Sequence, residues 1–515
     1  MKSLLNTALS GAAAAVILSS TMSPANASAL RFDTALNTIV GAEAEIPSYD
    51  AARDQIFVVG IDEEDASFVR IVNATTGDIV GALDLSAVPG GAANSVAVSG
   101  NRVAVAVEAA NPVNPGSVLV FDAANIDAAP NVYTVGALPD QLSFTPDGGR
   151  LVVANEGEPE GYLPGQIDPE GSISIIDLGT GTVATADFTS FNGQEDALRA
   201  AGVRIFGPGA SAAQDLEPEF SAISADGATA FVTLQENNAV AVVDIASATV
   251  TEVLPLGFKS WQPGDNALDP SDRDGIDGNF QSLEGLYGLY QPDAILTVEA
   301  NGQTFFITAD EGDARDYDGF AEEIRGEDIG LAAPFDRLEL TDTLGADGPE
   351  DGEFFTFGGR GFSIRDADGN LVFDSGDMVE QIVAELPGAF NDGRSDAKGP
   401  EPEAVEFGIV DGVPVLFLGL ERANSDDLGT ILTFSLEGLG LGTDPTFLGA
   451  ITSDLLARPE GLSFFTRGGL DFLAAADEET GNLVIFALNV VPAPAAAGLM
   501  LFGLAGLGMY RRRRK

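Results

Sequence analysis

PDQLSFTPDGGRLVVAN, residues 139–155, is the stretch of sequence that decides the fold. Two short runs rich in apolar and β-branched residues, Gln141–Thr145 and Arg150–Ala154, flank the turn sequence PDGG. Such runs are typical of β-strands, and Asp-Gly tolerates the positive φ that tight turns require. The stretch therefore predicts an antiparallel hairpin, and ISIID at Ile173–Asp177 predicts a third strand.

The same pattern occurs seven times along the chain, with a polar or acidic residue opening the first run and a Glu closing the second. Six of the seven opening residues lie directly after a proline. The members of each pair are 14 to 18 residues apart, which is the length of two short strands and a turn. Because an antiparallel hairpin returns to the side where it began, both members of a pair are expected at the same end. The pairs are Ser48/Glu64, Asn94/Glu108, Asp140/Glu156, Glu219/Glu236, Asp293/Glu311, Glu403/Glu421 and Glu460/Glu478.

Seven such units predict an all-β fold, a seven-bladed β-propeller with insertions in the middle blades. The paired carboxylates are then expected to gather at one mouth of the ring. The insertions are Gly161–Ile167, Phe188–Gly209, Trp261–Gly288 and Asp313–Arg394, and Gly361–Leu386 within the last is predicted to add extra strands to its unit. Long loops on a rigid scaffold often carry binding sites, so these insertions are candidates for ligand specificity.

Both ends of the 515-residue chain look like processing signals. A basic start, the apolar stretch Leu4–Ser19 and the sequence ANA before Ser28 predict a secretory signal peptide over residues 1–27. One large propeller domain is expected over residues 28–490. The remaining residues, 491–515, have an apolar run over 495–510, expected as a short transmembrane segment, and a basic tail expected to stay cytoplasmic.

The C-terminal end opens with the motif Val491, Pro492, Ala493, Pro494 and Ala495. Motif, apolar run and basic tail in this order resemble the PEP-CTERM (VPxPA-type) sorting signals of exosortase systems. The resemblance implies export and recognition by exosortase-type sorting machinery. It also implies transfer to the cell surface, outer membrane or extracellular matrix after C-terminal processing. A simple C-terminal tail anchor is the alternative.

The composition excludes several function classes. With 79 acidic and 25 basic residues the net charge is −54, so no nucleic-acid partner is expected. The chain has no cysteine and no histidine, which excludes disulfides, Cys or His zinc sites and a Ser-His-Asp triad. No haem, iron–sulfur cluster or nucleotide is expected either. A metal must be held by oxygen, which favours Ca²⁺, or else Mg²⁺ or Mn²⁺. Solubility in salty water would explain most of the acids without any function.

Acids cluster where the predicted hairpins begin and end, so they would meet at the mouth. So many carboxylates would repel one another unless cations lay among them. Alternatively, each Asp or Glu only shapes the start of a strand and accepts backbone hydrogen bonds. The candidate metal ligands in these segments are Glu156, Glu158, Glu217, Glu219, Glu236, Asp310, Glu311, Asp313, Glu401, Glu403, Glu421 and Glu460.

Two further groups of charged residues accompany them. The loop 269–278 has alternating acids and glycines like a calcium loop without fitting the EF-hand pattern, which makes Asp269, Asp272 and Asp274 candidate ligands. The turn 366–370 is a weaker set of the same kind, for which an exposed acidic hairpin turn is the commoner explanation. Arg315, Lys398 and Arg422 lie within the acidic segments and are either internal counter-charges or the groups that bind an anionic ligand.

Six phrases of the sequence resemble the choice-of-anchor I family of exported bacterial proteins. They are NEGEP (Asn155–Pro159), DLEPEF (Asp215–Phe220), LQENNAVAVVD (Leu234–Asp244), DEGDAR (Asp310–Arg315), SDAKGPEPEAVEFG (Ser395–Gly408) and LGLERA (Leu418–Ala423). The chain is also similar to the mesenchyme-specific cell-surface glycoprotein group. The resemblance covers about residues 30–490 and implies a seven-bladed propeller on a cell surface. It supplies no catalytic residue.

Three functions fit these observations. The first is a divalent-cation-dependent binding or adhesion module that takes a carbohydrate, a matrix polymer or a partner protein. The second is a Ca²⁺-dependent phosphoesterase, similar in outline to propeller phytases, in which carboxylates hold metals that bind phosphate and activate water. The third is a structural acidic surface protein. The sorting signal, the lack of the usual catalytic residues and the family favour the first, and whether the protein is an enzyme stays open.

Overall fold

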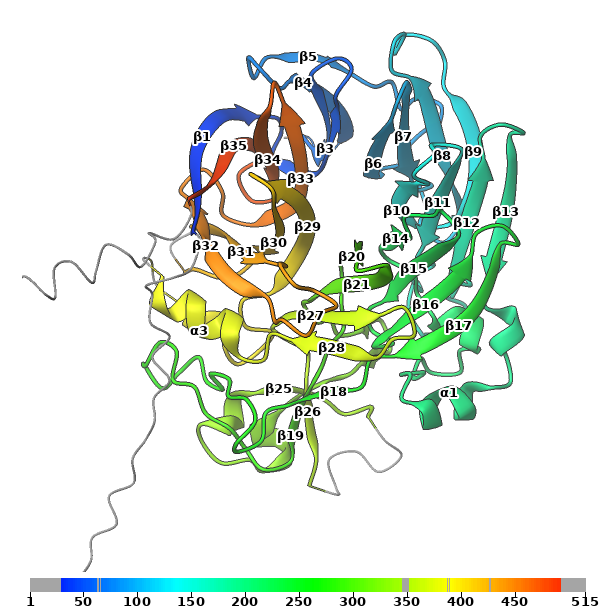
Figure 1. Cartoon of the computed structure of the whole chain (residues 1–515). Coiled ribbons are helices and arrows are strands. Elements are labelled where there is room, and N and C mark those ends of the chain that lie inside the picture. Colours follow the sequence, from blue (N-terminus) through cyan, green and yellow to red (C-terminus); the bar gives the residue numbers. More distant parts are fainter. Residues whose placement is uncertain are drawn as a thin grey trace, which may run out of the picture. The chain divides into compact units, whose positions relative to one another are not determined.

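The computed structural model describes residues 29–491, apart from 63, 65, 345–351, 387, 389, 426 and 427. Within these residues, the chain from Leu30 to Val490 forms one compact unit (Figure 1). The predicted signal peptide, the predicted transmembrane segment 495–510 and motif residues Pro492–Ala495 lie outside the described residues. In the part of the chain that is described, no helix is both long and apolar enough to cross a membrane.

Seven four-stranded sheets form the blades of a propeller in the described chain. Blade 1 has strands β2 (Glu43–Asp50), β3 (Gln55–Ile61), β4 (Ser67–Asn73) and β5 (Ile79–Ala82). Blade 2 has β6 (Ala93–Ser99), β7 (Arg102–Val107), β8 (Pro115–Asp122) and β9 (Asn131–Ala137). Blade 3 has β10 (Pro139–Phe144), β11 (Arg150–Asn155), β12 (Ser172–Asp177) and β13 (Thr182–Asp187). Blade 4 has β14 (Ser221–Ile223), β15 (Thr229–Leu234), β16 (Ala239–Asp244) and β17 (Thr249–Pro255).

The other three blades complete the ring. Blade 5 has β20 (Ile295–Ala300), β21 (Gln303–Asp310), β27 (Gly361–Asp366) and β28 (Leu371–Asp374). Blade 6 has β29 (Pro402–Val410), β30 (Val413–Leu420), β31 (Gly429–Ser435) and β32 (Thr446–Ser453). Blade 7 has β33 (Pro459–Arg467), β34 (Leu470–Asp477), β35 (Asn482–Val491) and β1 (Ala29–Ile39). The first strand of each blade contacts the first strand of the next, and β33 contacts β2. The predicted all-β, seven-bladed propeller is therefore confirmed.

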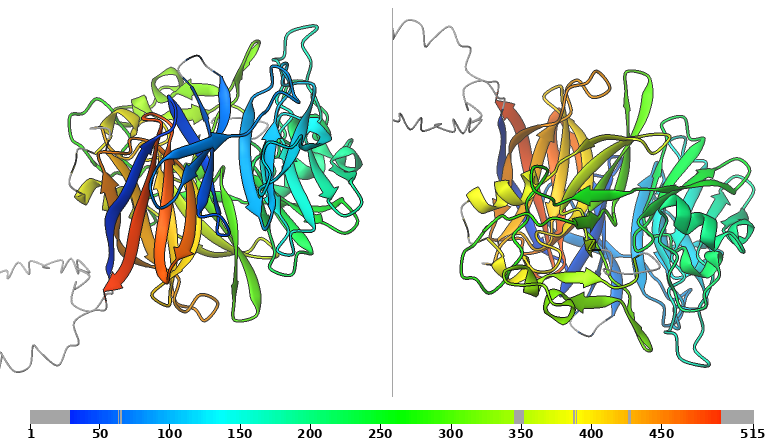
Figure 2. Two further views of the ribbon diagram at one scale, coloured as in Figure 1. Left: turned by 90° about the horizontal axis from the view of Figure 1, so that it is seen from above. Right: turned by 90° about the horizontal axis from the view of Figure 1, so that it is seen from below.

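The start of the chain closes the last blade. The strand order of blade 7 is β1-β35-β34-β33, so β1 is its outer strand and comes from the opposite end of the sequence. Figure 2 shows β1 in blue beside β35 in red. This arrangement covers an edge of β35 that would otherwise be free to pair with another chain. The ring consequently cannot open without separating two strands of a sheet.

The apolar core lies between the blades rather than on the axis. Seven clusters of buried residues each join two neighbouring blades. In one of them Val152 of blade 3 packs with Val232 of blade 4. In the cluster that closes the ring, Ile485 of blade 7 packs with Val58 of blade 1. Near the axis, the residues at which the inner strands begin are polar.

The inner strands are irregular where they near the axis. In blades 1, 2, 3, 6 and 7 the register of the first strand against the second shifts at this point. Such a bulge leaves a residue without a partner and re-aims its side chain. In blades 4 and 5 the corresponding residue lies just before the strand. The residues at these seven positions are Glu45, Asn94, Asp140, Glu219, Asp293, Glu403 and Glu460.

The insertions build a second layer. A five-stranded sheet in the order β18-β19-β26-β25-β24 draws its strands from two insertions, and β22 and β23 form a small hairpin. Trp261 is fully buried beneath this sheet with Leu268, Leu286 and Leu340. The strands are β18 (Phe258–Ser260), β19 (Leu286–Leu289), β22 (Asp316–Tyr317), β23 (Phe320–Ala321), β24 (Glu323–Arg325), β25 (Glu339–Thr341) and β26 (Phe354–Thr356).

The described helices are short and belong to the connections. They are α1 (Glu195–Ala201), α2 (Ala212–Asp215) and α3 (Met378–Glu385), with 3₁₀ turns at Thr189–Phe191, Gly326–Ile329, Phe335–Arg337 and Asp392–Arg394. One expectation was wrong. Residues 361–386 do not add extra strands, because β27 and β28 are the third and fourth strands of blade 5 itself. The inserted chain separates them from β21, which hid their membership of the blade from sequence reasoning.

Deleting β1 tests the closure of the ring. A chain that starts at Val40 should lose about 3 kcal/mol or more of stability, because Leu30 leaves its apolar cluster and β35 loses a paired strand. It should also self-associate through the open edge. Urea unfolding and light scattering measure both effects against a chain that starts at Ala29. Equal stability of the two chains would contradict a closing role for β1.

Candidate functional site

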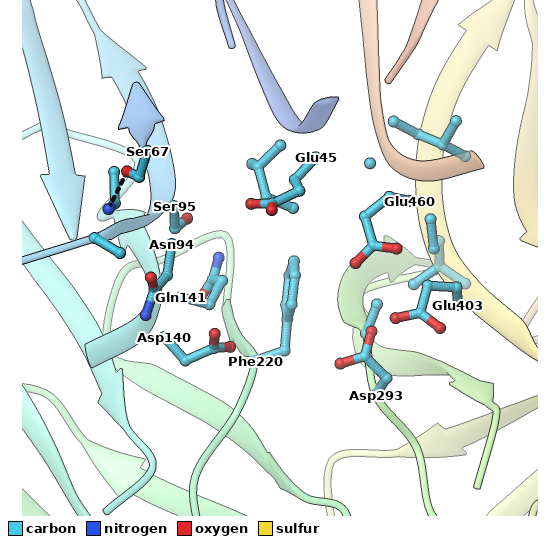
Figure 3. Close-up of a pocket in the computed structure, with 18 of the residues that line it drawn as sticks. Glu45, Ser67, Asn94, Ser95, Asp140, Gln141, Phe220, Asp293, Glu403 and Glu460 are labelled. Atoms are coloured by element: carbon cyan, nitrogen blue, oxygen red, sulfur yellow. Dashed lines mark hydrogen bonds between the residues drawn. The ribbon is translucent and has the colours of Figure 1, made fainter. Parts of the chain in front are cut away.

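A cavity of about 380 Å³ lies where the inner strands meet. Its lining comes from blades 1 to 7, and Figure 3 shows carboxylates from several blades directed toward a common space with Phe220 among them. The acids that line it are Glu45, Asp140, Asp293, Glu403 and Glu460. Four of them lie at the bulges of blades 1, 3, 6 and 7, and Asp293 lies just before the first strand of blade 5, so acids from five blades converge where the inner strands begin.

Burial is the main cause of the raised pKa values of these carboxyl groups. It raises the pKa of Asp140 to about 8, with further contributions from the charges of Asp293 and Glu45. The pKa of Glu45 is raised to about 7 and that of Asp293 to about 6, again chiefly by burial. Burial and neighbouring acids also hold the pKa values of Glu403 and Glu460 well above the usual range. A carboxyl here loses its hydration and meets like charges, and both disfavour ionisation.

One group of three acids, the first trio, joins blades 3 and 4. Glu156 follows β11, Glu219 precedes β14 and Glu236 follows β15. Each offers an oxygen, and the three oxygens lie within 4.8 Å of one another. Burial raises the pKa of Glu236 to about 7 and those of the other two well above the usual range. This is a geometry that a metal ion could occupy.

A second group, the second trio, joins blades 5 and 6 in the same way. It consists of Glu311 after β21, Glu403 in β29 and Glu421 after β30, again with oxygens within 4.8 Å of one another. The Nε2 of Gln235 donates to Glu311 Oε2 at 2.8 Å. Arg422 Nη2 lies 2.7 Å from Glu421 Oε1. The second trio therefore has donors from the protein within its reach.

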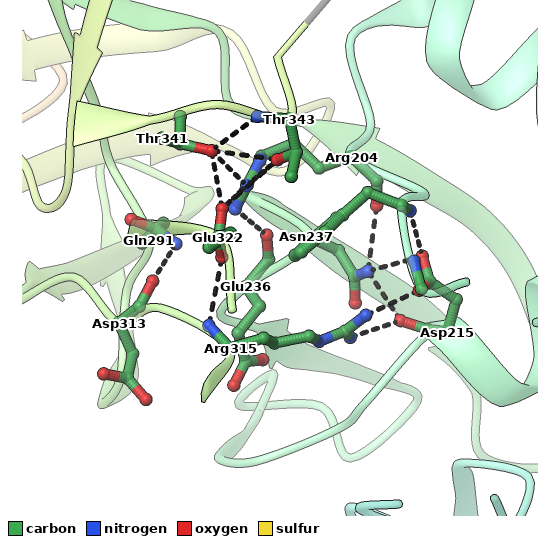
Figure 4. A network of polar contacts seen from close by, with 12 residues as sticks. Arg204, Asp215, Glu236, Asn237, Gln291, Asp313, Arg315, Glu322, Thr341 and Thr343 are labelled. Atoms are coloured by element: carbon green, nitrogen blue, oxygen red, sulfur yellow. Dashed lines mark hydrogen bonds and ion pairs between the residues drawn. The ribbon is translucent and has the colours of Figure 1, made fainter. Parts of the chain in front are cut away.

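The remaining acids of the predicted set have partners in the protein. Arg315 is buried, and its Nη1 lies 2.5 Å from Asp215 Oδ1 (Figure 4). Its Nη2 lies 2.8 Å from Glu217 Oε2. Asp313 pairs with Lys398. These contacts favour the interpretation of Arg315 and Lys398 as counter-charges.

Three further acids of that set are held in the same way. Glu401 pairs with Arg394 at 2.5 Å. Glu158 accepts a hydrogen bond of 2.7 Å from the Tyr317 hydroxyl. Asp310 accepts one of 2.7 Å from Thr308, and its pKa is raised to about 7 by burial.

The loop 269–278 uses its carboxylates within the insertions. Asp269 Oδ2 accepts the backbone N–H of Asn279 at 2.9 Å. Asp272 Oδ1 lies 2.8 Å from Arg337 Nε. Asp274 Oδ1 accepts the N–H of Ile276 at 2.8 Å. In the turn 366–370, Asp366 accepts the backbone N–H groups of the turn, as a capping acid does. These contacts account for the acids of both loops through local structure.

Sequence reasoning missed part of the lining. Asp140 and Asp293 were in the repeated pairs but not among the candidate ligands, and Glu45 was in neither set. In blade 1 the pairing of Ser48 with Glu64 was wrong, because Ser48 faces Phe57 near the hairpin turn. Aligning the blades by their prolines placed blade 1 in the wrong register relative to the other blades. Pro47 lies beyond the bulge, whereas the prolines of blades 3, 6 and 7 lie before it. Aligning the blades by the bulge instead of the proline would have found Glu45.

Comparisons with known proteins give this arrangement a family context. Residues 45–439 match the family model of the choice-of-anchor I domain, and residues 490–515 match that of the PEP-CTERM protein-sorting motif. Both resemblances expected from the sequence are confirmed.

Two curated relatives match parts of the chain. The "Mesenchyme-specific cell surface glycoprotein" of Strongylocentrotus purpuratus is 29% identical over 232 residues, which are 34% of this chain and 29% of that protein. "Gigasin-3a" of Magallana gigas is 35% identical over 104 residues, 17% of this chain and 34% of that protein. The chain thus matches only about a third of the length of either relative.

Solved structures give similarities over most of the chain. Hydrazine synthase of Kuenenia stuttgartiensis has a TM-score of 0.46 at 14% identity, covering 88% of this chain and 96% of that chain. The Cps50 (Swd1) β-propeller domain from Myceliophteria thermophila has a TM-score of 0.45 at 9% identity, covering 89% and 99%. The fold assignment itself follows from the sheet order described above.

The raised pKa values predict how the stability of the metal-free protein depends on pH. A carboxyl whose folded pKa exceeds its unfolded value contributes stability that is complete below the unfolded value and lost as pH rises through the folded value. For Asp293, Glu45 and Asp140 this loss begins at about pH 4 and is complete at about pH 6, 7 and 8, respectively. Thermal melting in EDTA from pH 4 to 8.5 should show it, and Asp140→Asn should reduce it. If Tm falls with rising pH as steeply in Asp140→Asn as in wild type, Asp140 is not one of the groups that cause the loss of stability.

The buried pairs of Arg315 predict a second outcome. Arg315→Met leaves Asp215 and Glu217 buried without their counter-charge, which should cost about 3–5 kcal/mol in urea unfolding. Arg150→Ala is the matched control, because Arg150 and Asp177 are 3.8 Å apart and both partly exposed, so its cost should stay under about 1 kcal/mol. If the two variants lose similar free energies of unfolding, Arg315 does not balance the buried charges of Asp215 and Glu217.

Proposed function

Because the chain belongs to the choice-of-anchor I family and ends in a PEP-CTERM sorting motif, we propose that it is a binding module displayed at the cell surface that works through divalent cations at its acidic mouth. The family and the motif make it an exported, cell-surface protein, and the motif implies processing by exosortase-type machinery. We propose in addition that divalent cations bind at the acidic mouth and that a ligand binds there through them.

The observation that supports the cation is the convergence of carboxylates at the axis. Two unit charges 4.8 Å apart repel by roughly 3–4 kcal/mol at an effective dielectric constant of 20. Three such carboxylates therefore carry a large unfavourable energy when ionised. A divalent cation among them turns this repulsion into attraction, and oxygen donors alone suit Ca²⁺. Mg²⁺ or Mn²⁺ would find the same donors.

The ligand follows from the chemistry of such a cation. A Ca²⁺ ion takes six to eight oxygens and keeps positions open when the protein fills only some of them. Oxygens of an acidic carbohydrate or matrix polymer can occupy those positions, which lets a protein of net charge −54 bind an anionic ligand. The name of the Strongylocentrotus purpuratus relative, a cell surface glycoprotein, agrees with a surface role.

A Ca²⁺-dependent phosphoesterase is the second candidate. It is favoured by the second trio, where Glu311, Glu403 and Glu421 lie near Lys398 and Arg422. Carboxylates for metals beside cations for phosphate are the groups that metal-assisted phosphoester hydrolysis needs. A purely structural acidic protein would need none of these arrangements.

Calcium titration of the body, residues 28–490, tests the proposal. Calcium at 100 times its Kd should raise Tm by about 3 °C, because binding to the folded state alone adds about 2.7 kcal/mol to a domain of this size. An acidic polysaccharide should then bind in calcium but not in EDTA. The absence of any calcium response would sink the metal-dependent functions. If the protein hydrolyses a phosphomonoester and Glu403→Gln abolishes this activity, its function is that of a phosphoesterase and not of a binding module.

A further inference from the structure

The two trios are alike in spacing but unlike in what surrounds them. We propose that a divalent cation binds at the first trio, Glu156, Glu219 and Glu236, where it ties blade 3 to blade 4. The carboxylates of the second trio already interact with hydrogen-bond donors and basic side chains of the protein, so the second trio is not a metal-cation site. This assignment rests on the proposed function, in that it says where the cation of the mouth is held.

Two oxygens of the first trio lack hydrogen-bond donors. Glu219 is 8% exposed and Glu236 is 3% exposed, and Oε2 of each is buried without a hydrogen-bond partner. A buried carboxylate oxygen that accepts no hydrogen bond has lost its water without replacement, which native structures avoid. A cation between the three side chains would satisfy both oxygens at once.

The protein's own cations near the first trio are already committed. Arg315 is near enough to lower the pKa of Glu236, but its guanidinium pairs with Asp215 and Glu217. Arg204 pairs with Glu322. Its Nη1 donates a hydrogen bond of 2.6 Å to the backbone oxygen of Glu236, not to the carboxylate (Figure 4). Among the described residues, no Lys or Arg forms an ion pair with a member of the first trio.

The second trio differs on each point. Glu311 accepts a hydrogen bond from Gln235, and the charge of Lys398 opposes the rise of its pKa. Glu421 pairs with Arg422 at 2.7 Å. Within the described chain, none of the buried oxygens without a partner belongs to Glu311, Glu403 or Glu421. An added cation would have to displace contacts that the protein already makes.

The donors of the first trio suit a hard divalent cation. Carboxylate oxygens are ligands of both Ca²⁺ and Mg²⁺, and Ca²⁺ accepts the more flexible geometry. The three oxygens lie within 4.8 Å of one another, close enough for one cation to lie between them. Three carboxylates and one Ca²⁺ leave a net charge of −1, which is far easier to bury than −3.

Two double variants test the assignment with equal changes of charge. The first-trio variant is Glu219→Gln with Glu236→Gln, and the matched control is Glu403→Gln with Glu421→Gln in the second trio. The full chain is titrated with Ca²⁺ alone by calorimetry and melted in EDTA and in calcium. The first-trio variant should lose at least about 100-fold in calcium affinity and the rise of about 3 °C in Tm. The control should keep both the rise and an affinity within about threefold of wild type.

Melting in EDTA separates loss of the site from loss of the fold. The first-trio variant should melt at or above the wild-type temperature in EDTA, because two repelling charges are gone. If it does not fold, the single change Glu156→Gln replaces it, since Glu156 is only partly buried. Retained calcium affinity in the folded variant would overturn the assignment, as would equal loss of affinity in the control.

The remaining outcomes distinguish this assignment from the proposed function. If the first-trio variant alone loses calcium but wild type binds no acidic polysaccharide, the cation site stands and the binding module fails. If both variants lose calcium, the assignment fails and the calcium-dependent module stands. Wild type that binds no calcium at all overturns both.

Discussion

The structure depends on how carboxylates are accommodated at the axis of a closed ring. A propeller brings the first strand of each blade to a common centre, so the residue that begins it shares space with six others. Here six of the seven are acids and Asn94 is the exception. The apolar clusters occupy the spaces between blades, and at the centre Phe220 lies among the acids. The raised pKa values and the buried ion pairs are both consequences of this crowding.

The insertions supply much of the balancing charge. Arg204 comes from the insertion after blade 3, and Arg315 from the one inside blade 5. Both guanidinium groups are buried near the mouth and hold Asp215, Glu217 and Glu322. A buried arginine with two carboxylate partners is stable only when its geometry is fixed. The added sheet, packed around Trp261, provides a rigid support for part of this network.

Much of the fold could be predicted from the sequence because a hairpin is a local feature. The run from Pro139 to Asn155 contains both strands and the turn, and β10 and β11 lie within it. Prediction failed where the partner is remote. In blade 5, strand β27 lies some fifty residues after β21, so no local pattern ties the two. In blade 1, Pro47 suggested an alignment that the bulge overrules.

The site was predictable in its residues but not in its grouping. All six members of the two trios were candidate ligands, since each begins or ends a strand. Their division into Glu156, Glu219 and Glu236 on one side and the second trio on the other depends on which blades are neighbours. The difference between the trios depends on Gln235 and Arg422, whose contacts only the folded chain reveals.

The closing of blade 7 links folding to display. Strand β35 ends at Val491, and the sorting motif matches residues 490–515, so the signal for anchoring begins where the last strand of the ring stops. A chain cut short before Asn482 lacks both the partner of β1 and the sorting motif. A chain that carries the complete sorting motif therefore also carries the whole of the strand that pairs with β1.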